Sequence, residues 1–194
     1  MKKFENKDYG KVRNVQGLKL SPEGGRALFS VQRYDIAKDA YLTDLHVCEL
    51  DGGRTYRLTA GGREGGGFWL DENRVLFPAA RGGEAPVDET ILYCIDVRGG
   101  EAFEYLRVPI AGAQCSPLPD GRFLVRAETD ANAPGEGEQD GWMYFDEYPF
   151  MDNGAGYVNR KRRSLFVYDP ESGDLKRLTP PLMQTYAPYF SEDV

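Results

Sequence analysis

The chain has 194 residues, of which 41% are hydrophobic and 28% charged, an ordinary globular composition that excludes a disordered chain. Its formal net charge of −7 argues against nucleic acid as a partner, because phosphate binding needs a basic face. The N-terminus lacks the apolar run of a signal peptide, and nowhere do about 18 apolar residues run together. We therefore expect a soluble, cytoplasmic protein.

The first residues, 1–10, are polar and are expected to form a loose lead-in. After them comes a unit in which an apolar strand end passes through a polar turn to an arginine and a second apolar strand. This unit occurs three times, at residues 20–29, 69–77 and 115–125. Its arginine recurs at intervals of 48 residues, as Arg26, Arg74 and Arg122.

A second unit follows each copy of the first. It reads as a strand, a tight glycine-containing turn and another strand, and in two copies it ends in Leu-Thr. Its three copies lie at residues 41–59, 91–108 and 163–179. Residues 32–40 are expected to link the two units of the first repeat, and 59–67 to cross over to the second repeat. In the third repeat, Leu165 and Val167 alternate with Phe166 and Tyr168, and we expect Leu165 and Val167 to be buried on one face.

A repeat of about 40 to 50 residues with four strands is typical of a β-propeller blade. The sequence therefore predicts an all-β fold, a partial β-propeller with about three four-stranded antiparallel blades of the WD40 or TolB-like kind. The blades are expected at residues 11–60, 65–109 and 112–180, with the start of a fourth at 186–194.

Three cysteines, Cys48, Cys94 and Cys115, make an odd count without the spacing of a metal site. Cys48 and Cys94 fall at apolar strand positions of equivalent repeats. We interpret all three as small buried hydrophobic residues in a reducing compartment. The sequence predicts no cofactor and no metal site.

The third repeat carries a long insertion between Ala127 and Arg163. Its first half is acidic and is expected to be flexible, whereas its second half is aromatic and then basic. Loops longer than about 12 to 15 residues in a compact domain are usually functional or disordered. The aromatic half is too apolar for a free tail, so we expect it to pack against another surface. These aromatic residues are Trp142, Tyr144, Phe145, Tyr148, Phe150 and Tyr157.

Three motifs of the insertion, together with the blade repeats, resemble the propeller of prolyl-oligopeptidase-family (S9) serine peptidases, closest to the acylaminoacyl-peptidase and dipeptidyl-aminopeptidase-like branch. The motifs are Asp146-Glu-Tyr-Pro-Phe150, Asn153-Gly-Ala-Gly-Tyr157 and Arg160-Lys-Arg-Arg-Ser-Leu-Phe-Val-Tyr-Asp169. The resemblance implies that residues 1–194 are an incomplete N-terminal propeller. It also implies a C-terminal α/β-hydrolase domain, absent from this sequence, that carries a Ser-Asp-His triad.

The sequence itself lacks the elements of that triad. A serine hydrolase of this type needs Gly-x-Ser-x-Gly and a histidine base, but no Gly-x-Ser-x-Gly occurs, and the single histidine, His46, lies within a predicted strand. Asp146 and Glu147 are adjacent in an extended segment and point to opposite faces, so we favour ion pairs with Arg160, Arg162 or Arg163 over acid-base catalysis.

Two functions remain open. The first is the non-catalytic propeller portion of a serine peptidase, which restricts the access of short peptides to the catalytic domain. The alternative is a stand-alone propeller module for protein-protein interaction. In the first case, six residues are expected to contact the hydrolase domain or to line the path of the substrate, and none is assigned to catalysis. They are Asp146, Glu147, Phe150, Asn153, Tyr157 and Arg160.

The predicted partners are the hydrolase domain and short peptides, with no nucleic acid and no membrane. Open blade faces also predict self-association or, where none occurs, marginal stability, because uncovered apolar surface promotes association.

Overall fold

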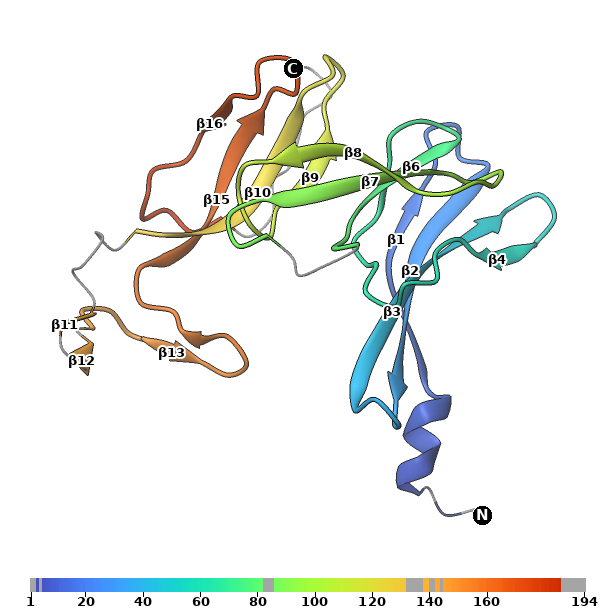
Figure 1. The fold of residues 1–194 in the computed structure, drawn as a ribbon, viewed down its shortest axis with the longest axis horizontal. Helices are drawn as coiled ribbons and strands as arrows, with labels where there is room; N and C mark the ends of the chain where they lie inside the picture. The colour runs from blue at the N-terminus through green and yellow to red at the C-terminus, as the bar shows by residue number, and fades with distance from the viewer. Residues whose placement is uncertain are drawn as a thin grey trace. The chain divides into compact units, whose positions relative to one another are not determined.

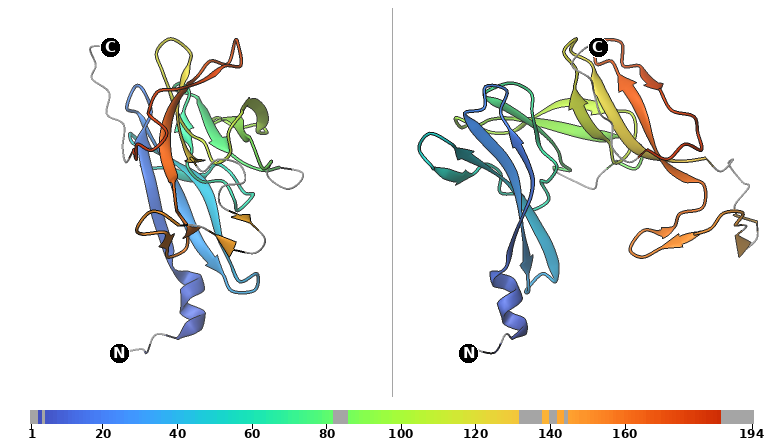
Figure 2. Two further views of the ribbon diagram at one scale, coloured as in Figure 1. Left: turned by 90° about the vertical axis from the view of Figure 1, so that its left-hand side faces the viewer. Right: turned by 180° about the vertical axis from the view of Figure 1, so that it is seen from behind.

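The computed structural model describes residues 3, 5–81, 86–131, 138–139, 142–143 and 145–185. Its main elements are three four-stranded antiparallel sheets in which the strands lie side by side in chain order. Unit 1, Met1–Val108, holds sheets A and B, and unit 2, Pro109–Val194, holds sheet C (Figures 1 and 2). The repeated four-stranded sheets confirm the predicted fold class, a partial β-propeller. The expected start of a fourth blade at 186–194 lies outside the described residues.

Each sheet is one blade and is formed by one copy of each sequence unit. Sheet A consists of β1 Arg13–Leu20, β2 Arg26–Asp35, β3 Ala40–Glu49 and β4 Thr55–Arg57. Sheet B consists of β5 Phe68–Trp69, β6 Arg74–Pro78, β7 Thr90–Asp96 and β8 Phe103–Val108. Sheet C consists of β9 Gln114–Pro117, β10 Phe123–Asp130, β15 Lys161–Tyr168 and β16 Leu175–Arg177.

The pairing of β2 with β3 is longer than predicted. The ladder continues to Asp35 opposite Ala40, so the link comprises only residues 36–39 and not 32–40. Tyr34 and Tyr41 face each other across the ladder with ring centroids 5.2 Å apart, and such cross-strand aromatic pairs stabilise a sheet.

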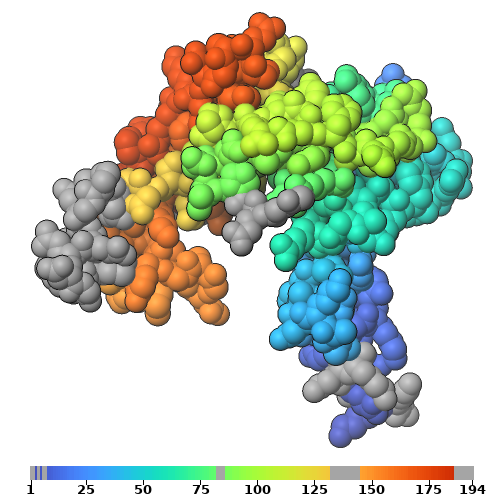
Figure 3. Space-filling view, in the orientation of Figure 1, coloured from blue at the N-terminus to red at the C-terminus, as the bar shows by residue number. Residues whose placement is uncertain are grey.

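The lead-in is also more ordered than predicted. Residues Asn6–Lys11 form a 3₁₀ helix, η1, whose first turn is capped because Glu5 and Asp8 exchange backbone and side-chain hydrogen bonds. Gly10 lies against the Ile36 side chain at the turn of the β2–β3 hairpin. In the space-filling view, η1 and this hairpin lie together at one end of unit 1 (Figure 3).

The threonine of the Leu-Thr pair that ends two of the repeats makes the same hydrogen bond in both. The Thr59 hydroxyl oxygen accepts the Leu45 N–H at 3.0 Å, and the Thr179 hydroxyl oxygen accepts the Leu165 N–H at 3.1 Å. Strand β4 has ended at Arg57 and β16 at Arg177, so each threonine satisfies an inner-strand amide just beyond the end of the outer strand.

The core of unit 1 lies between sheets A and B. From sheet A, Leu28, Leu45 and Val47 are fully buried, and Tyr56 and Leu58 pack at their edge. The facing residues of sheet B include Trp69, Val75, Phe77, Tyr93 and Ile95. Burying a large apolar side chain contributes roughly 1.5–3 kcal/mol, so this interface contributes substantially to the stability of unit 1.

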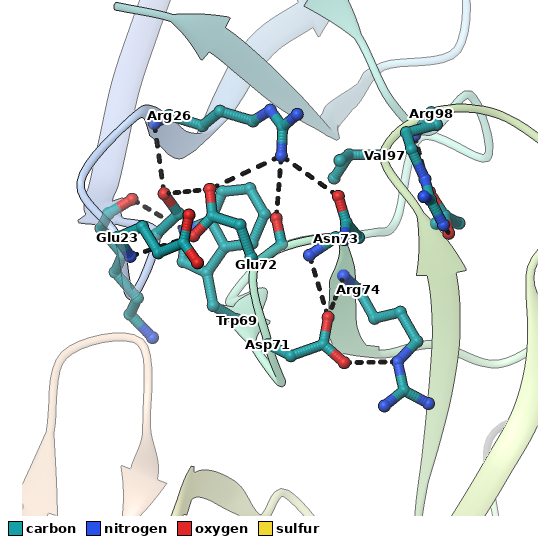
Figure 4. A network of polar contacts seen from close by, with 12 residues as sticks. Glu23, Arg26, Trp69, Asp71, Glu72, Asn73, Arg74, Val97 and Arg98 are labelled. Atoms are coloured by element: carbon teal, nitrogen blue, oxygen red, sulfur yellow. Dashed lines mark hydrogen bonds and ion pairs between the residues drawn. The ribbon is translucent and has the colours of Figure 1, made fainter.

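Polar contacts surround this core. The Trp69 indole N–H donates to the Lys19 carbonyl at 3.1 Å, and the Tyr56 hydroxyl donates to the Val97 carbonyl at 2.9 Å. At the strand turns, Glu72 of sheet B accepts hydrogen bonds from the Ser21 hydroxyl and the Glu23 N–H, and Arg26 donates to the Glu72 carbonyl (Figure 4). These hydrogen bonds therefore join the turn between β1 and β2 of sheet A to the turn between β5 and β6 of sheet B.

A buried carboxylate joins three segments of unit 1. The Asp44 side chain has no exposed surface and pairs with Arg33 of β2 and with Arg57 of β4, the latter at 2.8 Å. It also accepts the Gly62 N–H at 2.9 Å. Burial raises the pKa of Asp44, but the hydrogen bonds from both arginines and from Gly62 outweigh it, so its pKa lies below the ordinary 3.8.

The burial expected for β15 is wrong in one respect. Phe166 and Tyr168 are buried, whereas Leu165 and Val167, which were expected to be buried, are only half-buried. Phe166 lies opposite Val125 and beneath the Arg177 guanidinium, 5.5 Å from the ring centroid. The face with the aromatic residues is thus the better packed of the two faces of sheet C.

We expect Asp44→Asn to lower the free energy of unfolding by about 3 kcal/mol at neutral pH, because it breaks a buried ion pair. Since the folded-state pKa of Asp44 is lowered, its contribution is present at neutral pH and is lost as the pH falls through that pKa, so the difference should shrink in acid. Urea unfolding at several pH values measures this, with Asp51→Asn in an exposed turn as the control. Equal stability of Asp44→Asn and the wild type at neutral pH would contradict the assignment.

Candidate functional site

The insertion leaves sheet C at the end of its central ladder and returns to the same place. Asp130 of β10 pairs with Lys161 of β15, and the Ala131 N–H donates to the Arg160 carbonyl at 3.0 Å. The described part of the insertion includes β11 Glu138–Gln139 paired with β12 Trp142–Met143, and β13 Met151–Asp152 paired with β14 Gly156–Tyr157. The β13–β14 hairpin projects from the four-stranded sheet (Figure 1).

Two ion pairs brace the base of this hairpin. Asp146 pairs with Arg160, and Glu147 pairs with Arg162, as the sequence suggested. Glu147 also accepts the Arg160 N–H at 2.9 Å, so both carboxylates bind the segment that leads into β15. Arg163, the third predicted partner, is instead exposed, and its N–H donates to the Gln184 side chain at 2.9 Å.

Asn159 completes the base. Its side-chain oxygen accepts the N–H groups of Asp146 and Glu147 at 3.3 and 3.2 Å, and the residue is buried. Asn159 is not among the residues predicted from the sequence, because one asparagine in a loop has no periodicity or spacing that indicates a structural role. The next residue, Arg160, has a φ of +53°, a strained conformation that these contacts hold in place.

The ion pairs determine the protonation of both carboxylates. The hydrogen bond from Arg160 lowers the pKa of Asp146, and those from the Arg162 side chain and the Arg160 N–H lower the pKa of Glu147. Both groups are therefore ionised at neutral pH and engaged with arginines. This argues against a general acid at this site, which needs a raised pKa.

Three aromatic rings form a small cluster above the base. The Phe145 ring centroid lies 4.8 Å from that of Phe150 and 5.2 Å from that of Tyr157, distances typical of attractive aromatic pairs. Phe150 precedes β13 and Tyr157 ends β14, so the cluster ties the hairpin to the chain that enters it. Of the predicted aromatic residues, Trp142 and Tyr144 have side chains outside the described part.

The hairpin nevertheless exposes much apolar surface. Tyr148 is 93% exposed, and Phe150, Met151 and Tyr157 are also exposed. Large aromatic side chains that stay in solvent on a braced scaffold are typical of an interaction surface.

The six predicted site residues thus fall into three groups. Asp146, Glu147 and Arg160 lie together at the base, and Phe150 and Tyr157 lie together in the aromatic cluster. Asn153 is exposed in the hairpin turn, where its N–H donates to the Asp152 side chain at 2.8 Å, and it reaches neither group.

His46 packs within sheet A. It lies in β3 with its ring stacked on Phe29, centroids 5.8 Å apart, and burial lowers the pKa of its imidazole despite the nearby Asp44 carboxylate. Among the described residues, no cluster of three or more histidine, cysteine or acidic side chains is arranged to hold a metal ion. No helix in the described part of the chain is long and apolar enough to span a membrane.

Unit 1 also contains a pocket of about 370 Å³ between the ends of sheets A and B. Its arginines include Arg57 and Arg98, which already pair with Asp44 and Asp96. The pocket therefore offers neither a nucleophile nor a clear excess of charge, and we assign it no ligand.

Comparison with solved structures shows similarity to parts of larger peptidases. An acylaminoacyl peptidase from Pyrococcus horikoshii matches with a TM-score of 0.65 and 11% identity, over 91% of this chain and 26% of that chain. The isopeptidase AtxE2 matches with a TM-score of 0.52 and 16% identity, over 84% of this chain and 28% of its own. A puromycin-hydrolyzing peptidase from Mycobacterium tuberculosis matches with a TM-score of 0.50 and 21% identity, over 87% and 22%.

No protein-family model matches the sequence, and the search of curated proteins finds no match either. At these identities the similarity shows a shared fold. The chain spans about a quarter of the length of the solved structures that it matches.

We expect Asn159→Ala to loosen the insertion without unfolding sheet C, because it leaves two backbone N–H groups without their acceptor. Hydrogen-deuterium exchange should become faster by roughly tenfold at residues 145–160 and should stay unchanged in β10 and β15. Asn153→Ala, in the exposed turn, is the matched control. Unchanged exchange across the insertion in Asn159→Ala would show that Asn159 does not brace it.

Proposed function

We propose that this chain is the non-catalytic propeller portion of an S9-type serine peptidase of the acylaminoacyl-peptidase or dipeptidyl-peptidase-like kind. In this proposal the propeller limits which peptides reach an α/β-hydrolase domain outside these 194 residues. The similarity of fold to the acylaminoacyl peptidase from Pyrococcus horikoshii, over 26% of that chain, supports it.

The observation that carries the proposal is the construction of the insertion. An interaction site needs exposed apolar groups that are held rigidly, because flexible groups lose entropy on binding. The base of the insertion supplies rigidity through the Asp146–Arg160 and Glu147–Arg162 pairs, and the hairpin presents Tyr148, Phe150 and Tyr157. Aromatic side chains bury a large area with little loss of rotamer freedom.

The chemistry of the chain agrees with a supporting role. The sequence has one histidine, His46, and it stacks on Phe29 within sheet A. The sequence contains no Gly-x-Ser-x-Gly, so a serine activated in the manner of an α/β-hydrolase has to come from another domain.

The partner surface for the hairpin is accordingly an apolar one. In the proposed peptidase it belongs to the hydrolase domain or to the peptide that passes between the two domains. The competing function, a stand-alone interaction module, uses the same hairpin but has no hydrolase domain. The reading frame beyond Val194 distinguishes them, because the peptidase requires a further domain with Gly-x-Ser-x-Gly.

We expect the purified 194-residue chain to hydrolyse neither acylated aminoacyl nor dipeptidyl chromogenic substrates, because the groups that activate a serine are missing. The measurement is release of the chromophore over a buffer control. Turnover that persists in His46→Ala and survives repurification would overturn this expectation.

In the longer peptidase that we propose, the triple variant Phe150→Ala, Asn153→Ala and Tyr157→Ala should lower kcat/KM by roughly 10- to 100-fold. The variant removes side chains of the insertion that would position the hydrolase domain or the substrate, and a misplaced substrate loses transition-state stabilisation. Val87→Ala, at a loop residue that is 95% exposed, is the control. Thermal unfolding separates a catalytic effect from a loss of stability. Unchanged kinetics, or a collapse of propeller stability with no separate kinetic effect, would contradict a role in docking or access.

A further inference from the structure

Sheet A extends beyond the part that packs against sheet B. The crossover segment lies beside β3 at Thr43, whose N–H donates to the Gly62 carbonyl at 2.7 Å and whose carbonyl accepts the Glu64 N–H at 3.0 Å. Beyond Thr43 the β2–β3 hairpin continues as residues 33–42, and η1 lies against its turn (Figure 1). We call η1 together with residues 33–42 the sheet A extension.

The extension is braced by its own contacts. At its turn, the Asp35 carboxylate accepts the N–H groups of Ala37 and Lys38 at 3.1 and 3.2 Å. The Tyr34 hydroxyl donates to the Asp39 carboxylate, and Asp39 adopts a φ of +48°, which few residues other than glycine, asparagine and aspartate tolerate. A surface held in this way loses little conformational entropy when a partner binds to it.

Three large side chains of the extension are exposed, Tyr9 by 55%, Ile36 by 51% and Tyr41 by 68%. Tyr41 lies on the same face of β3 as Leu45 and Val47, because side chains alternate along a strand. Sheet B covers Leu45 and Val47 completely but leaves Tyr41 in solvent. The extension is therefore exposed although the neighbouring blade is in place, and a further blade packed in the same manner would also end before it.

The hairpin of the extension occupies the connection between the second and third strands of its blade. The insertion occupies the same connection in sheet C, between β10 and β15. The turns between the third and fourth strands, at the other end of each sheet, are short in all three blades, at residues 50–54, 97–102 and 169–174. In the described part of the chain, additions with exposed aromatic side chains thus lie at one kind of connection, which indicates a common use.

We propose that the sheet A extension is a second docking surface for the α/β-hydrolase domain, in addition to the hairpin of the insertion. This inference rests on the proposed function, because it requires a hydrolase domain in the longer chain. Tyr9, Ile36 and Tyr41 are the apolar anchors, and the extension carries basic and acidic residues in nearly equal number. The matching surface of the hydrolase domain is accordingly apolar and not strongly charged.

The size of the extension favours a domain of the same chain over a separate partner. The chain covers 26% of the acylaminoacyl peptidase from Pyrococcus horikoshii, so a peptidase of that length has most of its residues outside this sequence. A stable contact between separate proteins buries about 800 Å² on each side, more than three partly exposed side chains provide. A tethered domain is present at an effective concentration of the order of millimolar for a short linker, so a small apolar contact suffices.

Maleimide labelling of the full-length peptidase tests the proposal. Ile36→Cys or Tyr41→Cys is introduced together with Cys48→Ser, because Cys94 and Cys115 are buried whereas Cys48 is partly exposed. Each introduced thiol should react at least roughly tenfold more slowly in the full-length peptidase than in the 194-residue chain, because the hydrolase domain covers it. Circular dichroism establishes that both proteins are folded.

Asp51→Cys, in the exposed turn at the other end of sheet A, is the matched control and should react equally in both proteins. Equal labelling of Ile36→Cys and Tyr41→Cys in a full-length protein that hydrolyses acylated peptides would overturn this inference alone. A reading frame without a hydrolase domain would overturn the proposed function and this inference together. Protection that grows with protein concentration would indicate a second copy as the occupant and would also overturn it.

Charge placed on the extension provides a second measurement. Ile36→Glu with Tyr41→Glu should lower the midpoint of thermal unfolding more in the full-length peptidase than in the 194-residue chain, because only the former has the second domain to lose. Asp51→Lys, in the exposed turn, should change neither midpoint. An equal fall in both proteins would show that the extension stabilises only sheet A and would contradict the docking role.

Discussion

The burial of one sheet against the next is the constraint on which the rest of this structure depends. A four-stranded blade has two broad faces and cannot bury either by itself, so its stability comes from its neighbours. In unit 1 this contact combines an aliphatic face, led by Leu45 and Val47, with an aromatic face, led by Trp69 and Phe77. The indole of Trp69 and the carboxylate of Glu72 then fix the alignment, because each bonds a specific group of the preceding blade. The buried apolar area stabilises the contact between the two sheets, and the polar groups determine how the sheets are aligned.

The three blades differ in how they place charged side chains near the core. In sheet A, Asp44 lies between Arg33 and Arg57. The equivalent positions of sheet C hold Ser164, Thr129 and Arg177, and there the guanidinium donates to two hydroxyl groups and lies over Phe166. Next to sheet B, Arg81, which follows β6, lies over Phe77 and pairs with Glu64 of the crossover segment. A cation thus recurs beside an aromatic or acidic group, while the identity of its partner varies.

The base and the hairpin of the insertion differ in their contacts. Its base is held by ion pairs and by the buried Asn159, and its hairpin leaves aromatic side chains in solvent. The arginines that make the base rigid also keep Asp146 and Glu147 ionised and occupied. The same contacts argue against a catalytic role for these two carboxylates and agree with the docking role that we propose for this segment.

The blade architecture could be predicted from the sequence, since recurring arginines, turns and Leu-Thr pairs each have a local cause. Gly24 adopts a φ of +76° in its turn, and Thr59 closes a ladder amide, and both signals are short-range. The sequence also indicated the acidic-basic pairing within the insertion, because Asp146 and Arg160 stand out in composition. Which face of each strand is buried depends on the packing of the sheets, as Leu165 and Phe166 show. Alternation along a strand defines two faces but does not indicate which of them another sheet covers. The tertiary structure likewise decided the role of Asn159, whose contacts depend on where the chain returns to the sheet after the insertion.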